Sequence, residues 1–114
     1  MYFINELETH KQIFPLATPQ DQLMHLCEEL NERQVAKETY FDEWADALFV
    51  AISLQRFNET KILAEIMLDK LYYNQSITTQ KALDKHLLKA IEKVKSRKYY
   101  FINGRYEREK NEEK

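Results

Sequence analysis

Acidic residues recur at a regular spacing in two neighbouring segments of the chain, and their spacing could support metal chemistry. Glu28, Glu29 and Glu32 form an EExxE motif, and Glu43 and Asp46 form an ExxD motif further along. Because residues three apart lie on one face of an α-helix, each motif can turn two carboxylates toward one ion. Oxygen ligands alone suit a hard divalent cation such as Mg²⁺ or Mn²⁺. The two motifs therefore predict a metal site.

Two amphipathic helices must position these carboxylates. Residues 19–33 carry an apolar stripe at helical spacing, which consists of Leu23, Leu26, Cys27 and Leu30. Glu29, Glu32 and His25 fall on the opposite face, where we interpret His25 as solvated. Residues 39–56 predict a helix that is apolar on two sides, with Phe41, Trp44, Ala45, Leu48 and Ile52 on one and Ala47, Val50 and Leu54 on the other. Such a helix is buried against its own bundle and a second subunit, so Glu43 and Asp46 need a partner charge or a metal.

The scarcity of glycine defines the fold class. One Gly and two Pro among 114 residues exclude a glycine-rich phosphate loop and a fold of many short strands. Abundant helix formers favour an all-α bundle of four to five helices, expected over residues 2–13, 19–33, 39–56, 59–73 and 79–99. Thr18 and Pro19 are typical of a helix start, Asn58 can cap the fourth helix, and Gly104 is interpreted as a helix-ending turn. Residues 1–104 are expected to form one domain, followed by a charged tail over 105–114.

The order and spacing of the two acidic motifs resemble the MazG-like family of all-α nucleoside triphosphate pyrophosphohydrolases. That family carries EExxE and ExxD motifs on successive helices, as residues 28–32 and 43–46 would here. The stretch FDEWADALFVAIS, residues 41–53, also resembles the equivalent helix of the related dimeric all-α dUTPases. The resemblance covers roughly residues 20–100. It implies a small helical bundle that is completed by oligomerisation, as a homodimer or homotetramer.

The resemblance also implies roles for the acidic residues. Glu29, Glu32, Glu43 and Asp46 correspond to the metal ligands of the family, with Mg²⁺ as the expected cofactor and Mn²⁺ as a possible substitute. Glu28 and Glu29 are the candidate catalytic residues, and Glu28 could orient a ligand, add a ligand or act as the general base. The implied reaction cleaves a (deoxy)nucleoside triphosphate to the monophosphate and pyrophosphate, in control of the nucleotide pool. A dUTPase-like specificity is the alternative within this class.

Basic residues must hold those phosphate oxygens that the metal does not, because the chain has no phosphate-binding loop. Lys93 and Arg97 end a stripe of cations in the last predicted helix, and they are the first candidates for phosphate contacts. Asn58 and Lys61 form a second candidate pair at the start of the fourth helix. For the earlier lysines of the stripe, a solvated helix face is the preferred interpretation; these are Lys81, Lys85 and Lys89.

Charge and hydropathy limit the partners. The chain has 17 Lys and Arg against 19 Asp and Glu, a net charge of −2, which argues against a general nucleic-acid-binding protein. A non-catalytic helical module that contacts nucleic acid or a protein through residues 81–106 is the alternative to an enzyme. The apolar run at 47–54 is too short to cross a bilayer, no signal peptide is evident, and the lone Cys27 favours a reducing compartment. We expect a cytoplasmic protein with Cys27 as a small core residue.

The aromatic residues allow more than one interpretation. Trp44 and Phe41 lie at helical spacing, so we expect them in the core and not against a nucleobase. Tyr99, Tyr100 and Phe101 follow the basic segment. They could stack on a base, pack against a second subunit or close the bundle.

Overall fold

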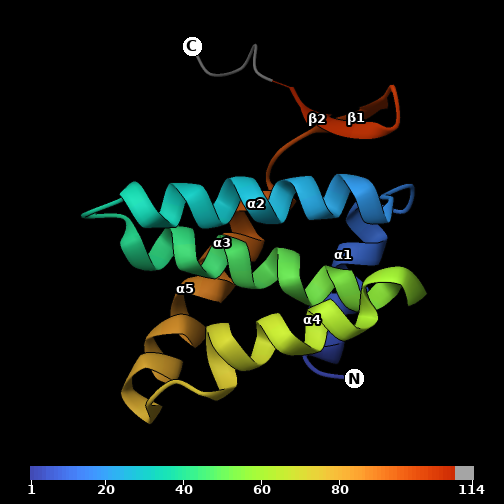
Figure 1. Ribbon diagram of the computed structural model, residues 1–114. Helices are drawn as coiled ribbons and strands as arrows, with labels where there is room; N and C mark the ends of the chain where they lie inside the picture. The colour runs from blue at the N-terminus through green and yellow to red at the C-terminus, as the bar shows by residue number, and fades with distance from the viewer. Residues whose placement is uncertain (110–114) are drawn as a thin grey trace.

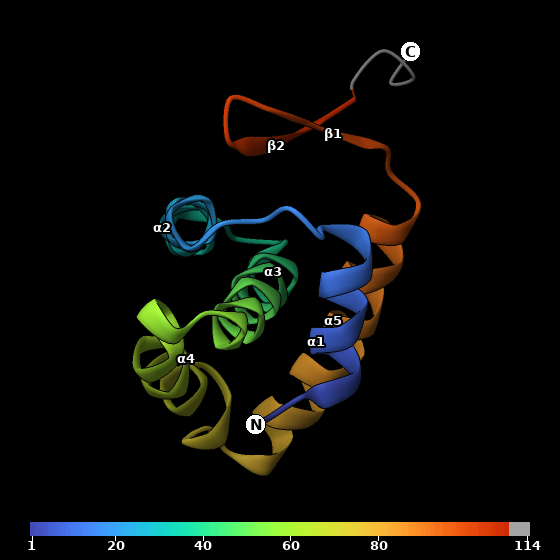
Figure 2. The same cartoon turned by 90° about the vertical axis from the view of Figure 1, so that its right-hand side faces the viewer.

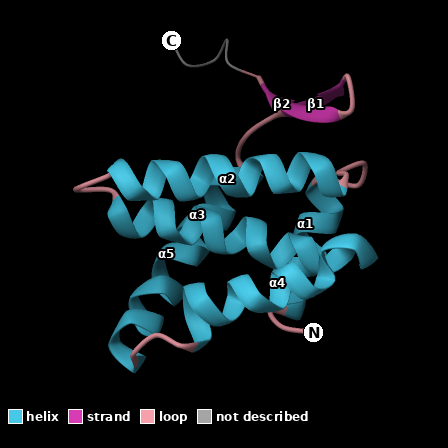
Figure 3. Cartoon of the chain, in the orientation of Figure 1, coloured by secondary structure: helices cyan, strands magenta, loops and turns pink. Residues whose placement is uncertain are grey.

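A computed structural model describes residues 1–109, and it consists of five α-helices and one β-hairpin (Figures 1 and 3). The helices are α1 (Ile4–Ile13), α2 (Pro19–Val35), α3 (Tyr40–Ser53), α4 (Lys61–Leu68) and α5 (Ile77–Lys95). Short 3₁₀ turns, η1 (Leu54–Arg56) and η2 (Asn58–Thr60), join α3 to α4, and a π-helical turn, η3 (Asp69–Tyr73), extends α4. The strands are β1 (Tyr99–Ile102) and β2 (Arg105–Arg108). The prediction of a mainly helical chain is confirmed.

Helix α3 is the centre of the bundle and packs against α1, α2, α4 and α5 (Figure 2). Leu48 and Ile52 on one side of α3 are fully buried, and so are Ala47 on the other side and Leu54, which begins η1. The two-sided apolar pattern of this helix is therefore satisfied within one chain. It does not by itself require the second subunit that the sequence suggested.

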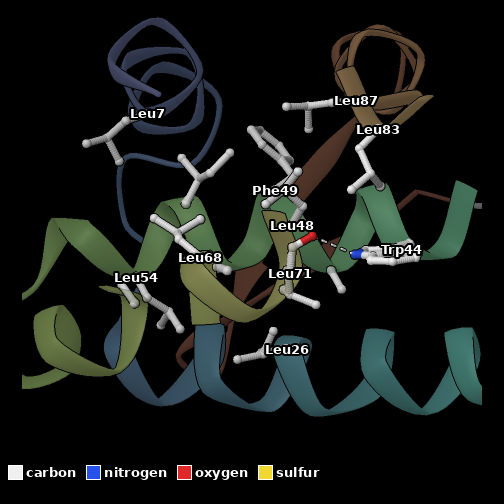
Figure 4. Packing of buried hydrophobic residues seen from close by; sticks show 14 of the residues in the cluster. Leu7, Leu26, Trp44, Leu48, Phe49, Leu54, Leu68, Leu71, Leu83 and Leu87 are labelled. Carbon is white, nitrogen blue, oxygen red and sulfur yellow. Dashed lines mark hydrogen bonds between the residues drawn. The ribbon is translucent and has the colours of Figure 1, made fainter. Parts of the chain in front are cut away.

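The core between α3 and its neighbours is built mainly from leucine side chains (Figure 4). Trp44 is buried among them, and its indole Nε1 donates a hydrogen bond to the backbone oxygen of Leu71 at 3.0 Å. This bond satisfies the one polar group of the indole ring. The expectation that Trp44 belongs to the core is confirmed.

Local sequence signals set most helix boundaries. Thr18 Oγ1 accepts a hydrogen bond from the Asp21 amide at 3.1 Å, and Pro19 occupies the first turn of α2, as predicted. Asn58 does not cap the fourth helix, because it begins the turn η2, and α4 starts after Thr60. Ser76 caps α5 by accepting a hydrogen bond from the Thr79 amide.

The end of α5 differs from the prediction. The helix stops at Lys95, and the chain then forms an antiparallel hairpin in which Phe101 pairs with Tyr106. Asn103 and Gly104 form its turn with φ values of 53° and 79°, as a type I′ hairpin turn requires, because both of its central residues are left-handed. The interpretation of Gly104 as a helix-ending turn is therefore wrong.

The expected charged tail is also corrected in part. Residues 105–108 form strand β2, so the boundary predicted at residue 104 falls inside the hairpin turn. The part of the tail at residues 110–114 lies outside the described residues. No helix within residues 1–109 is long and apolar enough to cross a membrane.

Helix α2 buries a different face from the one that its apolar stripe predicts. Cys27 is exposed, whereas Gln22 is buried together with Leu26. Glu29 is half-buried and its Oε1 atom is shielded from solvent. The buried face is therefore rotated away from Cys27 toward polar side chains, and the prediction of Cys27 as a core residue is wrong.

Candidate metal centre

The antiparallel pair α2 and α3 brings the predicted carboxylates together (Figure 1). Glu29 of α2 and Glu43 and Asp46 of α3 each place a carboxylate oxygen so that all three lie within 4.8 Å of one another. Glu32 lies one turn beyond Glu29, and its carboxyl group is within hydrogen-bonding reach of Glu29 and Glu43. We call these four residues the carboxylate cluster.

Crowding perturbs the acidity of the cluster. Burial, together with the neighbouring charges of Asp46 and Glu32, raises the pKa of Glu29 to about 8. Burial is also the main cause of the raised pKa values of Glu43 and Asp46. Like charges held this close cannot all stay ionised without a counter-ion, so the cluster alone retains a proton at neutral pH.

The cluster fits a hard divalent cation. Glu29 Oε1 is buried and has no hydrogen-bond partner within residues 1–109, which is costly for a carboxylate oxygen. The atoms available as metal ligands are carboxylate oxygens only, which is the ligand set that Mg²⁺ and Mn²⁺ prefer. A bound cation would supply both the missing partner of Glu29 and the missing positive charge.

Helix α5 and the residues that follow it bring two cations to the cluster. Lys93 Nζ lies 3.4 Å from Asp46 Oδ2, and the charges of Lys93 and Arg97 both lower the pKa of Asp46 against the effect of its burial. Because α5 is distant in sequence, inspection of α3 alone does not find this partner. Two positive charges beside four carboxylates do not neutralise the cluster when all four are ionised, and a divalent cation would balance the remaining charge.

An open cleft of about 450 Å³ extends from the carboxylate cluster to the hairpin. Glu29, Glu32 and Asp46 line one end together with Lys93 and Arg97. The other end is lined mainly by aromatic and neutral polar side chains, namely His10, Phe14, Gln22, Phe49, Tyr99 and Tyr106. Arg105, Glu107 and Arg108 of the hairpin also line the cleft. We call the two ends the carboxylate end and the hairpin end.

Glu28 lies on the wall of the cleft and not in the carboxylate cluster. Its Oε1 atom is 3.5 Å from His25 Nδ1, and His25 Nε2 is 3.4 Å from Asp21 Oδ1. The Glu28 side chain is half exposed, so it can exchange a proton with solvent. His25 therefore bridges two carboxylates and is less solvated than the sequence suggested.

The second pair of candidate phosphate contacts lies elsewhere. Asn58 is in η2 and Lys61 is the first residue of α4. Both are exposed, and neither lines the cleft. Because α4 begins beyond the end of α3 that is remote from Glu43, the structure does not bring this pair to the carboxylate cluster.

Sequence inspection missed the residues that fix the hairpin over α2. Asp21 is 4% exposed; its Oδ1 lies 3.7 Å from Arg105 Nε and its Oδ2 accepts a hydrogen bond from the Tyr106 amide at 3.4 Å. Tyr106 Oη accepts a hydrogen bond from the Leu16 amide at 2.9 Å. The Asn103-Gly104 pair was the signal that could have predicted the hairpin.

A buried histidine at the hairpin end was also missed. His10 is 3% exposed, and its two ring nitrogens face Gln22 at 3.0 Å and Arg56 at 3.2 Å. Burial, together with the nearby charge of Arg56, lowers the pKa of His10 to about 3. The ring is therefore neutral at physiological pH.

No protein-family model matches this chain, and no curated protein and no solved structure matches it.

Proposed function

We propose that this protein is a Mg²⁺-dependent nucleoside triphosphate pyrophosphohydrolase that cleaves a (deoxy)nucleoside triphosphate to the monophosphate and pyrophosphate. The observation that carries the proposal is the carboxylate cluster, which opens on a cleft beside Lys93 and Arg97. Carboxylates that could hold a divalent ion, next to basic side chains, match a polyphosphate, which needs both a metal and basic groups. The MazG-like resemblance of the two motifs agrees with this chemistry.

The residues of the cleft divide the work between metal and phosphate. Glu29, Glu32, Glu43 and Asp46 would hold the cation. When it is bound, Mg²⁺ neutralises phosphate charge and makes a coordinated water more acidic. Lys93 and Arg97, which lie on the same side as Asp46, would bind phosphate oxygens as charge develops on them.

The reaction needs a proton acceptor but no protein nucleophile. Water forms a bond to the α-phosphorus while the bond from that phosphorus to the bridging oxygen breaks, and pyrophosphate leaves. We assign the acceptance of the proton of this water to Glu28, because it lines the cleft beside the cluster and its half-exposed carboxylate can pass the proton to solvent.

Two finer statements belong to the same proposal. We propose that two or four copies associate, because Ile62 and Ile66 leave an apolar strip on the outer face of α4, at 73% and 46% exposure. Light scattering during size-exclusion chromatography tests the association, and a monomer at micromolar concentration would contradict it.

We also propose that the protein acts in the cytoplasm, where its substrates are made.

Pyrophosphate release tests the activity. The purified protein is incubated with each canonical and deoxy triphosphate, with Mg²⁺, with Mn²⁺ and with a chelator. We expect metal-dependent release of equimolar monophosphate and pyrophosphate, and loss of release in Asp46→Asn. Glu65→Gln, an exposed acid on α4 outside the cleft, is the matched control and should act as the wild type. Release of orthophosphate instead, or equal release in Asp46→Asn, would contradict the proposal.

A further inference from the structure

The two edges of the hairpin differ in what covers them. The hairpin projects from the helical bundle on the side of α2 (Figure 1). Its β2 edge meets α2, because the Tyr106 amide donates a hydrogen bond to Asp21 Oδ2 at 3.4 Å. The residues of β1 are more exposed, at 52% for Tyr100, 37% for Phe101 and 48% for Ile102. The open edge of the hairpin is therefore formed by β1.

The pairing within the hairpin determines which groups of β1 lie on this open edge. The Glu109 amide donates a hydrogen bond to the Lys98 oxygen at 2.9 Å. Opposite residues of an antiparallel pair alternate between hydrogen-bonded and non-hydrogen-bonded positions. Tyr99 and Phe101 therefore take the non-hydrogen-bonded positions, and their backbone amides and carbonyls point away from β2. Within residues 1–109, these outward backbone groups have no hydrogen-bond partner.

The side chains of β1 do not protect its edge. Natural proteins cover or charge their edge strands, because unpaired backbone groups can pair with a strand of another chain. Strand β2 carries charged side chains, namely Arg105, Glu107 and Arg108, whereas β1 has the sequence YYFI and no charge. An open edge of uncharged aromatic and aliphatic residues is suited to the addition of a further strand.

We propose that the β1 edge is an interface between two copies of this chain, in which the two β1 strands pair antiparallel about a two-fold axis and the two hairpins join in one sheet. The strand is complementary to itself in one register, with Tyr99 opposite Phe101 of the second copy. Only in that register do the outward groups of both residues find partners. A shift of two residues places one of them opposite a residue outside β1.

The same register places compatible side chains opposite each other. Lys98 lies opposite Ile102 of the second copy, so the two lysines do not face each other. At the axis, Tyr100 lies opposite Tyr100 of the second copy in a non-hydrogen-bonded pair, where cross-strand side chains come closest and aromatic pairs are favourable. Such a pairing is isologous, because each copy contributes the same surface.

The interface is separate from the apolar strip of α4 and from the proposed reaction. Its strand lies next to the cleft, because Tyr99 lines the hairpin end, and pairing would hold that wall in place. If both α4 and β1 form two-fold interfaces, four copies assemble.

A charge exchange at the axis tests the proposal. Tyr100→Lys and Tyr100→Glu each place like charges opposite each other, so light scattering should give half the particle mass of the wild type at the same concentration. An equimolar mixture of the two variants should restore the wild-type mass, because opposite charges then meet. Leu88→Lys, which changes an exposed apolar residue of α5, should keep that mass. Unchanged mass in either Tyr100 variant, or a mixture that stays at half, would overturn the proposal.

Amide hydrogen exchange locates the pairing and shows that the variants fold. In the wild type, protection of the Tyr99 and Phe101 amides should rise with protein concentration, and in Tyr100→Lys it should fall to that of unpaired amides. The Ile102 amide, which bonds within the hairpin, should stay protected in both. Protection of Tyr99 and Phe101 in a particle of one copy would mean that something else covers the edge, and it would overturn the proposal.

A variant of α4 separates the two interfaces. Ile62→Lys places a charge in the apolar strip of α4, and it should leave the protection of Tyr99 and Phe101 at the wild-type level. Loss of this protection in Ile62→Lys would assign the association to α4 and overturn the assignment to β1.

Discussion

The two ends of the cleft differ in how far apart their residues lie along the chain. The carboxylate end draws its acids from α2 and α3, which are consecutive helices, and it concentrates negative charge. The hairpin end draws on α1, α2, α3 and the hairpin, and its central group is the neutral His10. The carboxylate end thus gathers acids from two helices, whereas the hairpin end combines aromatic rings and the neutral His10 with the charged side chains of Arg105, Glu107 and Arg108.

The first prediction tests the carboxylate end and has the largest expected effect. Glu29→Gln should lower pyrophosphate release by about 10³-fold or more, because a ligand for the cation is lost beside the developing charge. Its thermal stability without metal should equal that of the wild type, because Glu29 with a pKa of about 8 is already protonated at neutral pH. Differential scanning calorimetry with and without Mg²⁺ measures this. A Tm that rises with Mg²⁺ as much as in the wild type would contradict the metal site.

The second prediction tests the anchor of the hairpin end. Asp21→Ala removes a buried carboxylate that contacts Arg105, His25 and the Tyr106 amide. We expect a loss of about 2 kcal/mol in the free energy of unfolding, since hydrogen bonds to charged groups contribute about this much. Amide hydrogen exchange should show lower protection at Tyr106 than in the wild type.

The carboxylate cluster provides the internal control for Asp21→Ala. The Mg²⁺ concentration at half-saturation should stay within about twofold of the wild-type value, because Asp21 is not among the clustered acids. A large shift in metal affinity with unchanged protection of the hairpin amides would mean that Asp21 contributes to metal binding and does not anchor the hairpin.

The third prediction uses pH, which acts on the two ends with opposite sign. The folded state raises the pKa of Glu29 to about 8, so its contribution is fully present below about pH 4.5 and is lost as pH rises through 8. The folded state lowers the pKa of His10 to about 3, so its contribution is present above about pH 6.5 and is lost as pH falls toward 3. Without metal, the free energy of unfolding should therefore be largest between about pH 4.5 and pH 6.5 and should decline on both sides of this range.

Two variants and a metal assign the two declines. Urea unfolding from pH 4 to pH 9 should show that Glu29→Gln, or Mg²⁺ in the wild type, weakens the alkaline decline only. His10→Gln, which cannot gain a proton, should weaken the acid decline only. An alkaline decline that persists in Glu29→Gln would show that another group causes it.

The fourth prediction has the smallest effect and concerns the hairpin turn. Gly104 has φ of 79° and open space around its Cα, so Gly104→Ala adds backbone strain without a clash. We expect a loss of about 1 kcal/mol in the free energy of unfolding. Gly104→Asn, which tolerates left-handed backbone, should lose less. Chemical denaturation measures both, and equal losses would mean that the strain is not the cause.

Local periodicity explains the parts of the fold and the site that were predictable. The cap formed by Thr18 and the EExxE and ExxD spacings act within one or two turns of helix, so they can be recognised from neighbouring residues. The rotation of α2 was not predictable from its apolar stripe. Gln22 and Glu29 face inward because they contact polar groups of other elements, and the positions of apolar residues carry no information about such contacts. The hairpin is not predicted, because Gly104 read from the sequence alone indicates a helix-ending turn.

The sequence by itself determined that the chain is mainly helical, and it predicted that acids of two consecutive helices converge, as Glu29, Glu43 and Asp46 do within 4.8 Å. Only the tertiary structure decided which groups meet those acids and what lies at the far end of the cleft. Lys93 reaches Asp46, Tyr106 reaches Asp21, and Arg56 reaches His10 across 47, 85 and 46 residues of chain. Such contacts depend on how whole helices pack, because helical periodicity specifies the face of a residue but not the element that covers it.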